Sequence, residues 1–240
     1  MIIDCISDLH GYEPDLPGGD LLLVAGDMTA SDTCIEWKFF NQWLIRQPYR
    51  QIVYIGGNHD GQLEDCYTSE KCKEIGIFLG PHHVEYLCDN SIIFEDLKIY
   101  GLPWTPTFYD WHFMKDRGKP MKAMVDLIPD DVDILLSHGP AYGCLDQCLS
   151  DDTGNLKNAG CRDLAKRLKS LKKLKLHVFG HIHEGYGFHR GNYLSINASI
   201  MDGNYNPVNK PYRIRLEETR ESRWEEIRMD SLREYPAQLT

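Results

Sequence analysis

The first quarter of the chain alternates three short apolar runs with one amphipathic stretch, and this alternation constrains the fold more than any other feature. "IIDCIS" (2–7), "DLLLVAG" (20–26) and "QIVYIGG" (51–57) have the length and composition of buried strands. The stretch 32–47 places apolar residues at helical spacing and ends before Pro48. This strand–helix–strand order predicts a largely parallel sheet with right-handed crossovers, as in α/β proteins.

The helical stretch carries an apolar and aromatic stripe. Its members are Ile35, Phe39, Phe40, Trp43 and Leu44. Such a stripe at helical spacing is typical of the buried face of a helix, so we expect these side chains to point into the core.

The remainder of the chain continues with short strands and one further helix. A basic amphipathic helix is expected near 160–172. Strands are expected at 83–88, 91–95, 98–103, 133–139, 175–180, 193–199 and 211–217, with a hairpin around "EDLK". No repeat or linker divides the chain, which predicts a single domain over 1–240 in which residues from about 220 are peripheral.

Composition excludes several classes of protein. The formal net charge of −10 argues against a general nucleic-acid or membrane-surface binder, which would present a basic face. No apolar run is long enough to span a bilayer, and the N-terminus lacks the basic start and uninterrupted apolar core of a signal peptide, so a cytoplasmic location is expected. None of the eight cysteines forms a CxxC pair, which disfavours a zinc ribbon.

Polar side chains with ligand chemistry stand where five predicted strands end. They are Asp8 and His10, then Asp27, then Asn58 and His59, then His138, and finally His181 and His183. In open α/β sheets, ligands bind in the crevice beyond the carboxyl ends of the strands. The sequence therefore predicts that these side chains meet at one site.

The residue types of this set favour metal binding. Residues two apart in extended backbone point to the same side, so Asp8 and His10 can face one ion. Glycines beside Asp27, Asn58, His138 and His181 are expected to allow sharp turns at the strand ends. Without His59, the set holds two carboxylates, one amide and four imidazoles, which exceeds the need of one tetrahedral ion and suits two ions that share a carboxylate. Mixed nitrogen and oxygen ligands without thiolates fit Mn²⁺, Fe²⁺ or Zn²⁺.

The order of these motifs resembles a known family. DxH, GD, GNHD, H and GHxH, read between residues 8 and 183, are similar to the motifs of the calcineurin-like metallophosphoesterase superfamily. "GHIHEGYG", "INAS", "NPVNKPYRI" and "PWTPTFYDWHF" further resemble the small metallophosphoesterase-domain proteins in the class III cyclic-nucleotide phosphodiesterase-like branch.

The resemblance implies a fold and a role for each motif residue. The fold would have four layers, with two mixed β-sheets forming a sandwich flanked by helices. Asp8, His10 and His183 would hold one metal ion, Asn58, His138 and His181 the other, and Asp27 would bridge them. His59 would lie over the substrate phosphate. The metal pair implied is Mn²⁺ or Fe/Mn, with Zn²⁺ as an alternative.

Two positions depart from related patterns. The protein-phosphatase branch follows its GD with a further Asp-Arg, whereas "GDMTASD" contains no arginine, which disfavours a phosphoserine phosphatase. Asp60 stands where many members of the narrower subgroup have glutamate. The shorter side chain leaves open whether Asp60 orients its neighbours.

The function expected is hydrolysis of small phosphodiesters, with 2′,3′- or 3′,5′-cyclic nucleotides among the candidates. A metal-bridging hydroxide would attack phosphorus, Asn58 and His59 would neutralise developing charge, and His59 would protonate the leaving oxygen. A nuclease or phosphomonoesterase on the same metal centre, and a nucleotide-binding module with slow turnover, remain open alternatives. The acidic balance weighs against long nucleic acids as substrates. The sequence sets neither the oligomeric state nor the physiological substrate.

The aromatic stretch 103–120 has two equally supported interpretations. Phe108, Trp111, His112 and Phe113 could stack on a nucleobase, or they could pack a loop onto the sheet. The histidines outside the motifs are interpreted as structural or surface residues; they are His82, His83, His177 and His189.

Overall fold

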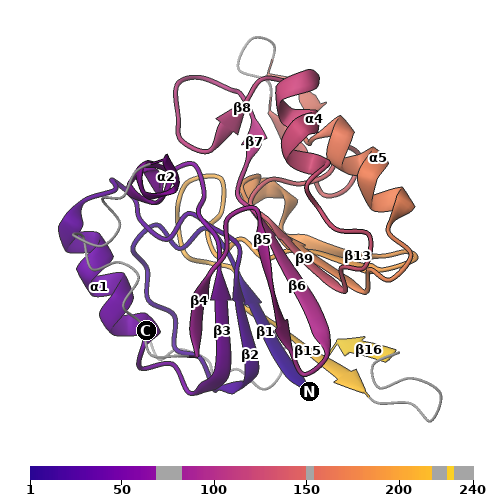
Figure 1. The fold of residues 1–240 in the computed structure, drawn as a ribbon. Coiled ribbons are helices and arrows are strands. Elements are labelled where there is room, and N and C mark those ends of the chain that lie inside the picture. The colour runs from indigo at the N-terminus through magenta and orange to yellow at the C-terminus, as the bar shows by residue number, and fades with distance from the viewer. Residues whose placement is uncertain (69–82, 150–153, 218–225, 230–240) are drawn as a thin grey trace.

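Two six-stranded mixed sheets pack face to face in the computed structural model, with helices on their outer faces (Figure 1). The structure describes residues 1–68, 83–149, 154–217 and 226–229. This is the α/β sandwich that the family resemblance implied. The expectation that residues from about 220 are peripheral falls mostly outside the described residues.

The first sheet has the order β16-β15-β1-β2-β3-β4. Strands β1 to β4 are parallel, and β15 and β16 add antiparallel at the β1 side. The bounds are β1 Ile2–Ile6, β2 Gly19–Val24, β3 Tyr49–Tyr54, β4 Val84–Tyr86, β15 Tyr212–Glu217 and β16 Glu226–Met229.

The second sheet has the order β13-β14-β12-β9-β6-β5. Its four central strands are parallel, and β5 and β13 are antiparallel edges. The bounds are β5 Asn90–Phe94, β6 Leu97–Leu102, β9 Ile134–Ser137, β12 Leu176–Phe179, β13 Gly187–Arg190 and β14 Leu194–Asn197. The predicted hairpin is β5–β6, whose two turn residues, Glu95 and Asp96, both have positive φ, as a tight hairpin turn requires.

Helices and small sheets complete the described fold. The helices are α1 Cys34–Leu44, α2 Gly61–Thr68, α4 Lys119–Val125, α5 Arg162–Ser170 and the 3-10 turn η1 His183–Gly185. Two small two-stranded sheets join β7 Thr105–Pro106 with β8 Met114–Lys115, and β10 Gln147–Leu149 with β11 Leu156–Asn158. Within the described residues, no helix is long and apolar enough to cross a membrane.

The central strands are largely apolar because both of their faces are covered. In β2, Leu21 and Leu23 point into the core between the sheets, whereas Leu22 and Val24 join the core on the outer, helix-covered side. Strand side chains alternate between faces, so burial on both sides demands a continuous apolar run. This packing fixes where the strands end, and therefore where the polar residues that follow them lie.

The prediction that the whole apolar stripe of the first helix is buried was wrong for two residues. Phe40, Trp43 and Leu44 of α1 are buried, but Ile35 and Phe39 are 55% and 54% exposed. Trp37 is buried instead, with its indole N–H donating to the Asp32 carboxylate. The helix turns its Trp37 side to the sheet, and this rotation carries Ile35 and Phe39 toward solvent.

Candidate metal centre

The polar residues from five strand ends meet at one edge of the sandwich. Asp8 and His10 follow β1, Asp27 follows β2, and Asn58 and His59 follow β3 of the first sheet; His138 follows β9, and His181 and His183 follow β12 of the second sheet. An isolated parallel bridge between Ser7 and Ser199 ties the two sheets together beside this edge. The sandwich therefore brings together all eight residues that the strand-end pattern singled out.

Asp8, His10 and His183 form the first ligand cluster. One ligand atom from each lies within 4.8 Å of the others. His183 Nε2 is 3.6 Å from Asp8 Oδ1, while His183 Nδ1 donates to the backbone carbonyl of Asp202 at 3.0 Å. That outer hydrogen bond places the proton on Nδ1 and leaves Nε2 to face the cluster, an arrangement typical of histidines that bind metal ions.

Asp27, His138 and His181 form the second cluster by the same criterion. His138 Nδ1 donates to the Ala25 carbonyl at 2.9 Å, which leaves Nε2 to face inward. Asn58 Oδ1 is 2.9 Å from that Nε2, so its amide joins the cluster.

The Asp27 carboxylate lies between the two clusters. Its Oδ2 atom is 3.7 Å from His10 Nε2 and 3.4 Å from His138 Nε2, and its Oδ1 atom accepts the His59 amide N–H at 2.8 Å. A single oxygen that faces both imidazole sets is placed as a bridging ligand would be.

Two of the imidazoles are held neutral. Burial lowers the pKa of His181 to about 3, and burial also lowers the pKa of His10. Among the described residues, His10 Nε2 is buried and has no hydrogen-bond partner. A neutral nitrogen with a free lone pair, excluded from water and unpaired, suits coordination to a cation.

The other two imidazoles face carboxylates directly. Burial alone would lower the pKa of His138, but the Asp27 carboxylate raises it to about 9. Asp8 raises the pKa of His183 to about 9 in the same way. Protons on these rings balance the buried carboxylates in the metal-free protein, and divalent cations would displace them. The residues therefore fit a pair of divalent metal ions.

Four of the expected ligands occupy the left-handed backbone region, which non-glycine residues rarely adopt. The φ angles are 53° at Asp8, 44° at His10, 53° at Asp27 and 68° at His181. Such strain concentrates at functional sites. The chain turns at the ligands themselves, so Asp8 and His10 converge through a turn and not through the extended alternation that the sequence suggested.

Most of the glycines beside the expected ligands provide space for side chains and do not form the sharp turns that were expected of them. Of Gly26, Gly57, Gly139 and Gly180, only Gly26 has a positive φ. A Cβ at Gly180 would overlap the Asp8 carboxylate, and one at Gly57 would overlap Asp27. These glycines let ligand side chains approach the backbone of the next loop.

His59 stands beside the clusters with its ring fixed on three sides. Its Nδ1 is 3.0 Å from the Ala30 carbonyl, and its ring centroid is 4.6 Å from that of His10 and 4.4 Å from that of Trp111. Because Nδ1 is engaged, Nε2 is the ring atom left for substrate. His59 could also complete a ligand group with His10 and Asp27, so the geometry allows either role.

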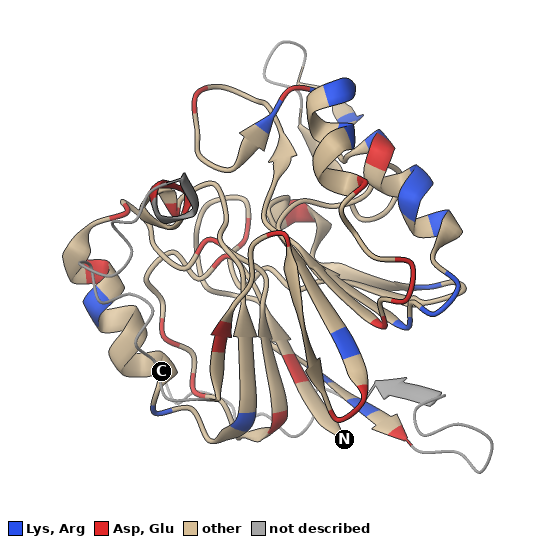
Figure 2. Ribbon diagram, in the orientation of Figure 1, with Lys and Arg blue, Asp and Glu red and all other residues tan. Residues whose placement is uncertain are grey.

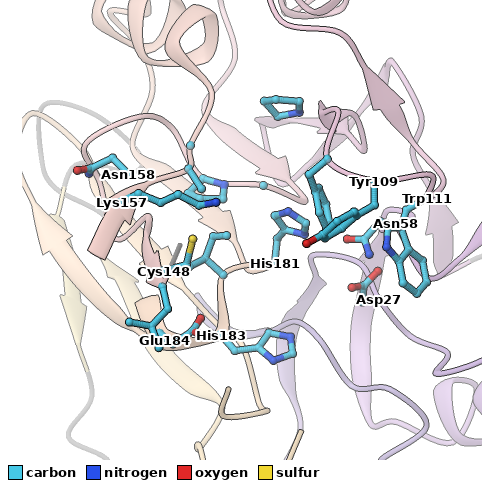
Figure 3. A pocket seen from close by; sticks show the side chains of 18 of the residues that line it. Asp27, Asn58, Tyr109, Trp111, Cys148, Lys157, Asn158, His181, His183 and Glu184 are labelled. Atoms are coloured by element: carbon cyan, nitrogen blue, oxygen red, sulfur yellow. The ribbon is translucent and has the colours of Figure 1, made fainter. Parts of the chain in front are cut away.

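A cavity of about 830 Å³ opens over the metal centre. Figure 3 shows Asp27, Asn58 and His181 at its middle, with Tyr109 and Trp111 on one side and Lys157 and Cys148 on the other. Phe108 and Tyr205 also line it; the Phe108 ring lies 5.0 Å from that of His181, and the Tyr205 ring lies 4.9 Å from that of His10. The volume suits a small organic molecule.

The aromatic stretch divides between the two interpretations. Phe108 and Trp111 line the cavity, but His112 is not among its lining residues, and its Nδ1 is 3.6 Å from the Glu64 carboxylate. Phe113 is fully buried against Trp104, with ring centroids 5.4 Å apart, so it packs the loop onto the core. Of the four residues for which stacking on a base was open, Phe108 and Trp111 therefore line the cavity, and His112 and Phe113 do not.

Sequence reasoning missed Tyr205 and Asp202. Both lie in the loop after β14, three and six residues beyond the end of the strand predicted at 193–199, and not directly at the strand end where the pattern placed the other site residues. Asp202 Oδ1 accepts the backbone N–H groups of Asn204 and Asn206 and so shapes the loop that carries Tyr205. The Asp-Gly and Asn-Pro pairs of "DGNYNP" signal a turn, but nothing in the sequence indicates that this turn returns to the metal centre.

A family model described as calcineurin-like phosphoesterase matches residues 1–185. The chain belongs to the calcineurin-like phosphoesterase family. This family acts on phosphoesters with divalent metals, and the model match contains all eight motif residues. Among curated proteins, the chain is 36% identical over 237 residues to human metallophosphoesterase domain-containing protein 1, a match that covers 91% of this chain and 72% of the human protein.

Two solved structures share the fold of this family member. The phosphopantetheinyl hydrolase of Mycobacterium tuberculosis aligns with a TM-score of 0.51 at 15% identity, covering 85% of this chain and 90% of that one. A putative 5′-nucleotidase from Staphylococcus aureus aligns with a TM-score of 0.54 at 13% identity, covering 95% of this chain and 52% of that one. At these identities the likeness concerns the fold alone.

Proposed function

We propose that this chain is a phosphodiesterase that uses two divalent metal ions, Mn²⁺ or an Fe/Mn pair, to hydrolyse small phosphodiesters such as cyclic nucleotides. The observation that carries the proposal is the position of Asp27 Oδ2, within 3.7 Å of His10 Nε2 and 3.4 Å of His138 Nε2, at the floor of a cavity. One shared carboxylate between two ligand sets is the arrangement that a two-metal phosphoester hydrolase needs.

The protein residues around this floor have distinct tasks. When bound, two divalent ions would polarise the phosphate and lower the pKa of a coordinated water toward neutrality. The Asn58 side-chain amide, held against His138, faces the same place and can stabilise charge on a phosphate oxygen. His59 presents Nε2 to the cavity, from where its imidazolium form can protonate the leaving oxygen.

The cavity wall favours a substrate with a flat apolar part. Phe108, Tyr109, Trp111 and Tyr205 line the cavity and are all at least 37% exposed. Exposed aromatic rings beside a phosphate site accept a nucleobase by stacking, whatever its identity. This wall supports the proposal that the phosphodiester substrate is a nucleotide.

A substrate panel tests the proposal. Protein reconstituted with Mn²⁺, Fe²⁺/Mn²⁺ or Zn²⁺ is assayed against bis-p-nitrophenyl phosphate, p-nitrophenyl phosphate, 2′,3′- and 3′,5′-cyclic nucleotides, and single-stranded DNA. We expect metal-dependent turnover of the diesters. Faster turnover of p-nitrophenyl phosphate would indicate a monoesterase, and faster turnover of DNA a nuclease. No hydrolysis at a measured content of two metal ions would refute the enzymatic proposal and leave a binding module.

A further inference from the structure

The wall of the cavity opposite the aromatic residues is a β-hairpin that carries a lysine. Strands β10 and β11 pair with Cys148 opposite Lys157, and both residues line the cavity. Figure 3 shows the Lys157 side chain extending from the hairpin toward His181, so its ammonium group enters the cavity from the side away from Trp111.

The base of this hairpin is firmly attached to the protein. Asp146 is buried, and its carboxylate accepts hydrogen bonds from the backbone N–H of Gly143 and Gly160, each at 3.0 Å, and from the side-chain amide of Asn158 at 2.6 Å. The Arg117 guanidinium donates to the carbonyl of Gly160 at 3.0 Å. Lys157 therefore projects from a strand whose position is set before substrate arrives.

Among the described residues that line the cavity, the lysine and arginine side chains are those of Lys157 and Arg117, and Lys157 is the one whose charge is available to a ligand. Arg117 also lines the cavity, but its guanidinium is used by the carbonyls of Ala159 and Gly160. Within the described residues 1–68, 83–149, 154–217 and 226–229, Lys157 forms no ion pair with a carboxylate. Figure 2 shows the basic residues of this part of the described ribbon on α4, on α5 and at β8, in a protein that is acidic overall.

The cavity is larger than a single phosphodiester group requires, because it reaches from Asp27 to the hairpin with a volume of about 830 Å³. We propose that Lys157 binds a second phosphate group, carried by the same small molecule whose first phosphate lies over the metal centre. This inference rests on the proposed function and specifies it further: the substrate is a nucleotide-like molecule with two separate phosphate groups. A lysine serves phosphate as a point charge and is suited to a terminal group at an open cavity wall.

Equilibrium binding tests this inference without depending on turnover. Calorimetric titration of the Mn²⁺-loaded protein with AMP, adenosine 3′,5′-bisphosphate and adenosine 2′,5′-bisphosphate compares ligands that differ only in the second phosphate. We expect at least one bisphosphate to bind about 10-fold more tightly than AMP, the size of effect that one charge-assisted hydrogen bond gives. Lys157→Ala removes this preference and leaves AMP binding unchanged, and Lys157→Arg retains it.

Lys166→Ala provides the matched control, because the Lys166 side chain is 79% exposed on α5 and Lys166 is not among the residues that line the cavity. Equal binding of AMP and both bisphosphates to the wild-type protein would overturn the inference while leaving the proposed function intact. An equal loss for all three ligands in Lys157→Ala would overturn it too, since Lys157 would then contact the metal-bound phosphate. Failure of AMP itself to bind would overturn the inference together with the proposed function.

Discussion

Asp60 and Thr29 join the loop after β3 to the loop after β2 through two hydrogen bonds. Asp60 Oδ1 accepts both the backbone N–H and the hydroxyl of Thr29, each at 3.1 Å. The other carboxylate oxygen accepts the N–H of Gly57 at 2.9 Å and of Met28 at 3.2 Å. This fully buried carboxyl group therefore holds the Asp27 and Asn58 loops in one arrangement.

Replacement of Asp60 should destabilise the protein before it affects chemistry directly. Asp60→Asn places an NH₂ group where an oxygen accepts hydrogen bonds from N–H and O–H donors of Met28, Thr29 and Gly57. A buried donor that loses its acceptor costs about 1–3 kcal/mol, so we expect a loss of about 2–4 kcal/mol in the free energy of unfolding. Urea denaturation of the metal-free protein measures it. Asp126→Asn removes an exposed carboxylate paired with Lys122 and should leave the unfolding midpoint unchanged. An unchanged midpoint in Asp60→Asn would contradict the linking role.

Most of the fold could be predicted because its sequence signals are local. The apolar runs at β1, β2, β3, β9 and β12 are buried on both faces, so each strand appears in the sequence as a continuous hydrophobic segment. The short elements gave no such signal: β7, β8, β10 and β11 have two or three residues each, and β13 has three exposed positions. Their existence depends on tertiary contacts.

The metal centre was predictable for a related reason, and its surroundings were not. Ligand residues stand immediately after detectable strands, so the position of the strand predicts the position of the ligand. Tyr205 and Lys157 reach the cavity from a loop and a short hairpin, which no periodicity marks. Phe113, for which the sequence left stacking and packing equally open, shows the converse limit, because an aromatic residue in an irregular stretch has the same appearance in the sequence whether it lines a cavity or fills the core.

A methyl group at Gly180 should remove one metal ion. Its Cβ would overlap the Asp8 carboxylate and the Ser7 hydroxyl, so Gly180→Ala must displace Asp8 from the first cluster. We expect metal analysis by mass spectrometry to fall from about two ions per chain toward one, with loss of activity. At Gly191 the nearest atom to an added Cβ is 3.6 Å away, which makes Gly191→Ala the matched control. Retention of two ions in Gly180→Ala would show that Asp8 is not a required ligand.

His59→Ala should separate proton transfer from metal binding. Loss of a general acid reduces kcat by about 10²- to 10⁴-fold, while a residue outside the ligand set leaves metal content intact. Both are measured on one preparation, with a 3′,5′-cyclic nucleotide as the substrate, because its alkoxide leaving group needs a proton whereas the nitrophenolate of bis-p-nitrophenyl phosphate does not. The loss should shrink for substrates whose leaving group needs no protonation. A parallel fall in metal content would make His59 a ligand, which its proximity to His10 and Asp27 also allows.

Phe108 and His112 offer a paired test of the aromatic wall, because only Phe108 lines the cavity. Stacking of a base on an aromatic ring contributes about 1–3 kcal/mol, so Phe108→Ala should raise the KM of a cyclic nucleotide about 5- to 100-fold with little change in kcat. His112→Ala should leave both constants at their wild-type values. If His112→Ala raised KM and Phe108→Ala did not, the base would stack on His112 and not on Phe108.

The buried His177 should make stability depend on pH. Its Nε2 donates to the Ser137 hydroxyl at 2.7 Å, and that hydroxyl donates to the Gly139 carbonyl at 2.7 Å. His177 Nδ1 is buried and has no partner in the part of the chain that the structure describes. Burial lowers the pKa of His177 to about 3 in the folded protein, against about 6.5 in the unfolded chain. Between about pH 6.5 and pH 3, His177 is therefore protonated in the unfolded state and neutral in the folded state. The free energy of unfolding falls as the pH drops through this range. The contribution amounts to about 2 kcal/mol between pH 7 and pH 5.

His177→Gln tests this contribution, because glutamine retains a donor toward Ser137 but cannot titrate. The free energy of unfolding of the variant minus that of wild type should therefore rise by about this amount as the pH falls from 7 to 5. Chemical denaturation at a series of pH values measures the difference, and His189→Gln, at an exposed position, should show a constant difference. A pH-independent difference for His177→Gln would mean that the folded protein admits the proton, for example by opening the strand end that carries His138.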